Sequence, residues 1–172
     1  MSEAALGLWH DYFVTVAQVS ATLAGLLFVG LTISLSHVLS GSGYMNRAFV
    51  SLFLQFEMLL IGIFGVVPGQ PEWVVGAEFI ATGLAVLTGT SVFVYNFPEH
   101  ADSVLGSRGP RLVRTVLAWI ATLGPVVAGI GLLLDQPQSL YCLVPAEVAC
   151  LYLSIANAWV FAVEIPRRMS QK

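Results

Sequence analysis

The chain has 172 residues, of which 57% are hydrophobic and 10% are charged, and its net charge is −3 at pH 7. Soluble domains contain about 25% charged residues, so a charge content this low excludes a soluble surface and indicates the lipid bilayer as the surroundings. The few, dispersed basic residues argue against nucleic acid as a partner. The length is typical of one domain, and we expect a single transmembrane domain over residues 1–172.

Long apolar stretches follow one another along the chain and predict an all-α integral membrane helical bundle. Each exceeds the roughly 20 residues that a membrane-spanning helix needs. None shows the two-residue alternation of a transmembrane β-barrel. We predict five transmembrane helices, at residues 11–39, 46–67, 72–97, 111–134 and 140–165.

The connections between these helices differ in length. Helix breakers at 68–71 and 135–138 predict tight turns, whereas residues 98–110 form the longest predicted loop. Gly124-Pro125 and Pro145 are predicted kink sites.

The basic residues occur only in alternate tails and loops, which predicts the orientation of the chain. Cytoplasmic loops of membrane proteins carry the excess of Lys and Arg. We therefore expect the N-terminus outside, the C-terminus in the cytoplasm, and a multi-pass protein of the plasma (inner) membrane. The predicted cytoplasmic basic anchors are Arg47, Arg108, Arg111, Arg114, Arg167 and Arg168.

Several polar side chains fall deep within the predicted helices. Glu57 lies near the middle of the second helix. Glu78, Glu147 and Gln18 each lie about 10 Å below the outer boundary, at 1.5 Å of rise per residue. We interpret these residues as an intramembrane polar site, with Thr22 and Thr82 as candidate hydrogen-bond partners.

Helical periodicity, at about 100° per residue, predicts which residues share a face. Gln18 and Thr22 lie on a stripe of small and hydroxyl residues that is expected to face inward, as such stripes do between packed membrane helices. Glu57 points away from Ser51 and Gln55 on its own helix, which suggests a second interface, between subunits. Another predicted face carries Glu147, Cys150, Ser154, Asn157 and Glu164.

The three acids have two interpretations. An isolated carboxylate in hydrocarbon is costly, so we expect at least one of Glu57, Glu78 and Glu147 to be protonated at neutral pH. They either bind a proton or a cation or act as neutral hydrogen-bonding contacts between helices. No catalytic constellation, metal motif or cofactor motif is evident, so we predict neither an enzyme nor a cofactor.

Three stretches resemble a known group of proteins: WHDYFV at 9–14, SATLAGLLFVGLTISLSHVL at 20–39 and VVPGQ at 66–70. They are similar to small uncharacterised multi-pass membrane proteins common in actinobacteria, some of which are labelled modulator of FtsH protease. The likeness covers the first two predicted helices. It implies a membrane partner and no catalysis, and it assigns no site residues.

Two functions follow as hypotheses. The first is a non-enzymatic membrane protein that associates through its helices with membrane partners, either a membrane protease or further copies of itself. The alternative is an oligomeric proton or cation channel or carrier that uses the intramembrane carboxylates.

Overall fold

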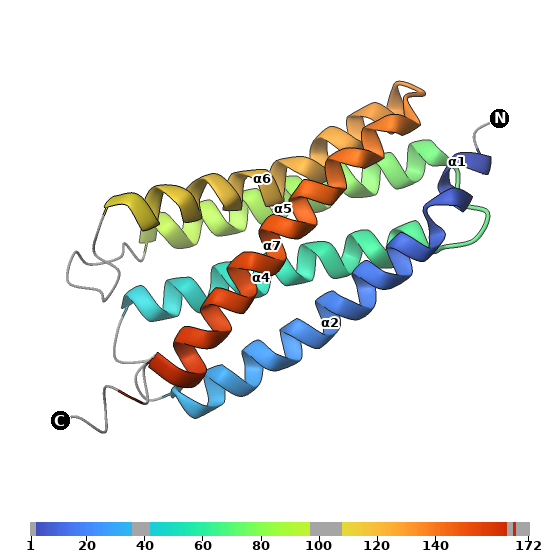
Figure 1. Cartoon of the computed structure of the whole chain (residues 1–172). Helices are drawn as coiled ribbons and strands as arrows, with labels where there is room; N and C mark the ends of the chain where they lie inside the picture. Colours follow the sequence, from blue (N-terminus) through green and yellow to red (C-terminus); the bar gives the residue numbers. More distant parts are fainter. Residues whose placement is uncertain (1–2, 36–41, 97–107, 165–166, 168–172) are drawn as a thin grey trace.

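The computed structural model describes residues 3–35, 42–96, 108–164 and 167 (Figure 1). Within these residues the chain is helical and contains no strand, which confirms the predicted all-α class. The elements are α1 (Glu3–Leu8), α2 (His10–Ile33), α4 (Ser42–Gly65), α5 (Glu72–Asn96), α6 (Arg108–Leu133), the 3₁₀ helix η1 (Pro137–Cys142), α7 (Leu143–Trp159) and the π-helical turn η2 (Val160–Glu164).

Five of the described helical segments are long and apolar enough to cross a membrane. They are His10–Ile33, Arg47–Gly65, Glu72–Val92, Leu112–Leu133 and Pro137–Val163. The last combines η1, α7 and most of η2, so the fifth predicted helix consists of three joined helical pieces.

The boundaries differ from the prediction mainly at helix beginnings. A short helix, α1, precedes α2, where the sequence suggested only a tail. Helix α4 begins at Ser42 and α6 at Arg108, so both start earlier than expected. Residues 36–39 of the first predicted helix and most of the predicted loop 98–110 lie outside the described residues.

The turn after α6 is stabilised by backbone hydrogen bonds. The Gln136 N–H donates to the Gly131 carbonyl at 2.9 Å, and Asp135 adopts a left-handed conformation with φ of 56°. This is the geometry of a Schellman cap, in which the left-handed residue ends the helix. Helix α6 runs unbroken through Pro125. Pro145 falls in the first turn of α7, where a missing N–H costs no helical hydrogen bond.

Successive long helices run in opposite directions and pack into one bundle (Figure 1). The pairs α5–α6, α2–α4, α6–α7 and α4–α5 pack side by side, and α7 also contacts α2 and α4. Helix α4 therefore has neighbours on several sides. Side chains that it directs into the bundle meet several other helices.

A close backbone approach between α5 and α6 involves a pair of glycines. A Cβ atom added to Gly129 would lie 2.5 Å from the Gly76 carbonyl oxygen, and one added to Gly76 would lie 2.8 Å from the Gly129 carbonyl oxygen. Small residues at helix contacts allow this close packing in membranes, where the hydrophobic effect does not hold helices together.

The apolar core consists of three clusters along the bundle. Val16, Leu54, Val86, Ala121 and Leu153 represent the middle cluster, to which all five long helices contribute. A second cluster at the α1 end contains buried aromatic side chains, and a third joins the opposite ends of α2, α4 and α7. The middle cluster surrounds the level at which the buried acids lie.

Candidate functional site

Glu57 is fully enclosed within the bundle. It lies in the middle of α4 with 0% of its surface exposed. Neither carboxylate oxygen has a hydrogen-bond partner among the described residues. This location corrects the prediction that Glu57 faces another subunit, because the side chain has no surface left for an external partner.

Gly83 on α5 provides room beside this carboxylate. A Cβ atom added to Gly83 would lie 3.5 Å from Oε1 of Glu57, 3.1 Å from the Thr122 carbonyl oxygen and 2.6 Å from Cγ2 of Val126. Glu57 therefore approaches the junction of α4, α5 and α6, where the missing side chain of Gly83 allows the helices to pack closely.

Glu147 lies on α7 and is also buried, with 8% of its surface exposed. Its Oε2 atom has no hydrogen-bond partner within the described part of the chain. Cys150 lies one turn after Glu147 on the buried face of α7. It belongs to the same core cluster as Met58, the neighbour of Glu57 on α4, and Tyr12 of α2 packs against this cluster. We call Glu57, Glu147 and Cys150 the carboxylate cluster.

A row of buried polar side chains continues from this cluster along the contact between α4 and α7. Nδ2 of Asn157 donates to Oγ of Ser51 at 2.5 Å, and Nε2 of Gln55 donates to Oγ of Ser154. Cys150 lies one helical turn before Ser154 on the same buried face of α7. These five residues, Ser51, Gln55, Asn157, Ser154 and Cys150, form what we call the polar track.

The predicted polar face is confirmed for Glu147, Cys150, Ser154 and Asn157, which are all buried on α7, while the side chain of Glu164 lies outside the described set. The sequence interpretation left Ser51, Gln55, Ser154 and Asn157 out of the candidate site, although it placed them on common helix faces. Their spacing was the available signal. Ser51 and Gln55 are one turn apart on α4, and Ser154 and Asn157 are one turn apart on α7.

The predicted direction of the polar stripe on α2 is wrong. Gln18 and Thr22 are exposed on the bundle surface, and the Thr22 hydroxyl donates to the Gln18 carbonyl of its own helix at 2.7 Å. The buried face of α2 instead carries Phe13, Val16, Ser20, Leu27 and Gly30. Gln18 and Thr22 therefore do not partner the acids within this chain.

Glu78 is half-buried and bonded elsewhere. Its Oε2 atom accepts a hydrogen bond from Nε2 of Gln70 at 2.7 Å, which directs the carboxylate toward the α4–α5 connection. Thr82 is buried, and its hydroxyl donates to the Glu78 backbone carbonyl at 2.7 Å. Within the predicted polar site, Glu78 thus bonds with Gln70 and not with Glu147.

The predicted basic anchors have different surroundings. Arg47 is buried, with 4% of its surface exposed, so it is not the surface anchor that we expected. Arg114 is half-buried and Arg167 is exposed. Arg108 and Arg111 lie in the first turn of α6, with side chains outside the described set, and Arg168 lies outside the described residues altogether.

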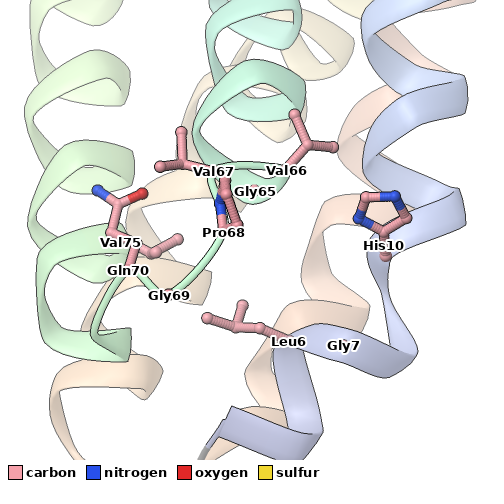
Figure 2. A pocket seen from close by; sticks show the side chains of 10 residues that line it. All are labelled: Leu6, Gly7, His10, Gly65, Val66, Val67, Pro68, Gly69, Gln70 and Val75. Carbon is pink, nitrogen blue, oxygen red and sulfur yellow. The ribbon is translucent and has the colours of Figure 1, made fainter.

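A cavity of about 340 Å³ opens at the α1 end of the bundle (Figure 2). Its walls come from α1, the beginning of α2 and the α4–α5 connection, and they include His10 and Gln70. Glu57, Glu78 and Glu147 are absent from its lining. The cavity is therefore separate from the carboxylate cluster.

Within the described ranges, no three His, Cys, Asp or Glu residues lie close enough together to hold a metal ion. Comparison of the chain with protein-family models, with curated proteins and with solved structures finds no match. The resemblance to the FtsH-modulator group thus stays a prediction from the sequence.

Proposed function

We propose that this protein is a non-enzymatic membrane carrier that takes up protons on Glu57 and Glu147 and translocates them. The observation that carries the proposal is Glu57, which is fully buried and has no described hydrogen-bond partner for either oxygen. Burying an unpaired charge is very costly, and such a group takes up a proton instead. Ionisable residues kept inside a membrane domain at this cost usually serve transport or proton relay.

The surroundings of Glu57 favour a proton over a metal cation. Hard cations such as Ca²⁺ require about six to eight oxygen ligands. The two oxygens of Glu57 have no polar partner within hydrogen-bonding distance among the described residues. A proton needs one carboxylate oxygen and no further ligands, so it suits this site.

The helices that surround the cluster all belong to one chain. The middle core cluster combines residues of α2, α4, α5, α6 and α7. The proposed carrier therefore needs no pore between subunits, in contrast to the oligomeric channel that the sequence suggested.

A flux assay in vesicles tests the proposal. The purified chain is reconstituted into liposomes that enclose a pH indicator, and a potassium diffusion potential drives proton entry. We expect Glu57→Gln to abolish the protein-dependent acidification, because an amide cannot take up and release the proton. Glu147→Gln is expected to reduce it.

Glu78→Gln is the matched control. It removes an acid from the same domain, but Glu78 is bonded to Gln70 and lies outside the carboxylate cluster. Its flux should equal that of the unmodified protein. A parent protein without flux, or a folded Glu57→Gln variant with full flux, would contradict the proposal.

Association with a membrane partner is a separate hypothesis. The enclosed position of Glu57 removes the residue that the sequence had offered for this role. Partnership with a membrane protease is now supported by the sequence resemblance, and capture of a protease from solubilised membranes would test it.

A further inference from the structure

We infer that the polar track is a one-sided proton route that joins the carboxylate cluster to the Arg47 end of the bundle. The inference rests on the proposed function and adds the side from which the site exchanges its proton. Its starting point is the pair of buried hydrogen bonds, Asn157–Ser51 and Gln55–Ser154, on one side of the cluster and the mainly apolar side chains on the other.

The track spans about half of a membrane. From Asn157 to Glu147 the rise along α7 is about 15 Å, whereas the hydrocarbon core of a bilayer is about 30 Å thick. At its far end Ser51 lies one helical turn from Arg47, near the beginning of α4. The track therefore reaches from the middle of the bundle to the end where α4 begins.

The track contains groups that can carry a proton and groups that position them. The hydroxyls of Ser51 and Ser154 can each accept and donate a hydrogen bond, and the Cys150 thiol is a weaker donor and acceptor. The amides of Asn157 and Gln55 donate to the two hydroxyls and hold them in line between α4 and α7.

The proton balance is simple. A proton that arrives from the Arg47 end adds to one carboxylate oxygen of Glu147 or Glu57 and forms an O–H bond. Release breaks that bond and returns the proton along the same groups.

The other helices contribute few competing polar groups near the acids. Helix α2 contributes Tyr12, which packs against the middle core cluster, and Ser20, whose buried hydroxyl has no hydrogen-bond partner among the described residues. On α5, Glu78 is bonded to Gln70. On α6, the Thr122 hydroxyl bonds to carbonyls of its own helix. Arg47 is the charged group of α4 at the far end of the track.

Beyond Glu147, toward the α1 end, the interior is apolar. The cluster there contains Phe13, Phe79, Leu140 and Leu143, all buried. The rings of Phe13 and Phe79 lie with their centroids 6.0 Å apart and connect α2 with α5. Tyr12 contributes a single hydroxyl beside this cluster, and the described residues offer no further row of hydroxyls or amides through it, so in this conformation the proton exchanges on the Arg47 side.

Infrared spectroscopy of the full chain in lipid tests the route. A carboxylic acid band that is lost in the double variant Glu57→Gln, Glu147→Gln is assigned to the carboxylate cluster. The rate at which this band shifts after transfer to D₂O measures proton exchange at the cluster. We expect Ser154→Ala and Ser51→Ala each to slow this exchange by about tenfold or more, equivalent to at least ~1.4 kcal/mol of barrier.

Thr88→Val is the matched control, because its hydroxyl is exposed and bonds within α5. Unchanged exchange in both folded serine variants would overturn the route and leave the proposed function intact. The absence of any band that depends on Glu57 or Glu147 would overturn both.

The unmodified protein provides a second measurement that does not depend on variants. In vesicles with one protein orientation, acidification on the Arg47 side alone should increase the carboxylic acid band. An increase caused by acidification on the α1 side alone would overturn the one-sided route.

Discussion

Gln55 and Glu57 are two positions apart on α4, and both side chains are buried. Gln55 donates a hydrogen bond to Ser154, although its own Oε1 lacks a described partner, whereas Glu57 makes no hydrogen bond through either oxygen within the described residues. A buried polar group without a partner costs free energy, and an apolar replacement of similar shape removes that cost. The two residues should therefore respond in opposite ways to the same substitution.

We predict that Glu57→Leu raises the free energy of unfolding by about 1–2 kcal/mol, while it abolishes proton flux. Gln55→Leu is expected to lower the free energy of unfolding by about 0.5–1.5 kcal/mol, the range for hydrogen bonds between membrane helices. Reversible unfolding in mixed micelles measures both. A marked loss of stability in Glu57→Leu would show that the acid holds the helices together.

At the scale of helix pairs, α5 and α6 are packed through Gly76 and Gly129. The added Cβ at Gly129 would meet a backbone oxygen at 2.5 Å and Cγ1 of Ile80 at 2.8 Å. The Gly76 carbonyl belongs to the backbone and cannot rotate away as the end of a side chain can. A methyl group added at Gly129 therefore forces α5 and α6 apart.

We predict that Gly129→Ala lowers the free energy of unfolding by about 2–3 kcal/mol, a typical cost of overpacking. Gly25→Ala is the control, because nothing lies within 4 Å of the added Cβ on α2. That control should be neutral or stabilising by up to about 1 kcal/mol, since Ala favours helix more than Gly. Equal stability of the two variants would argue against the close α5–α6 contact.

The sequence predicted the buried face of a helix correctly where several polar residues share that face. It did not do so where the buried face is mostly apolar. On α7 the acid, thiol, hydroxyl and amide share one face, and all four are buried. On α2 the buried face is mostly apolar, while Gln18 and Thr22 are exposed. Lipid is as apolar as a protein core, so hydrophobicity does not distinguish the two faces of a membrane helix.

The surroundings of Glu57 could not be predicted from the sequence for a related reason. Its direction on α4 was correctly separated from that of Ser51 and Gln55, but the sequence does not state which helices lie there. Because α4 packs against α2, α5 and α7, directions that diverge on α4 still end inside the bundle. Glu57 therefore points away from Ser51 and Gln55 and is still buried, because other helices cover that side of α4.

At the scale of the whole molecule, the basic residues that the structure describes gather at one end of the bundle. Arg47, Arg108 and Arg114 lie near the beginnings of α4 and α6. Asp11 and Glu72 lie in the first turns of α2 and α5, at the other end of the alternating helices. This polarity supports the proposed orientation, in which the Arg47 end faces the cytoplasm.

Reporter fusions check that orientation. We predict that reporters inserted at Gly69 and at Gln136 both behave as external, and that a reporter after Lys172 behaves as cytoplasmic. A cytoplasmic signal from Gly69 would reverse the orientation, and different sides for Gly69 and Gln136 would contradict the alternation of the helices.

Phe13 and Phe79, buried side by side in the apolar cluster at the α1 end, have a kinetic consequence. In the proposed carrier, a proton held at the cluster can leave toward that end only when these two rings, which connect α2 with α5, move apart. Collective helix movements take microseconds to milliseconds, so each opening would pass one proton and turnover would saturate at roughly 10³–10⁶ per second. A turnover rate that is limited by helix movement distinguishes a carrier from a channel that stays open and filled with water.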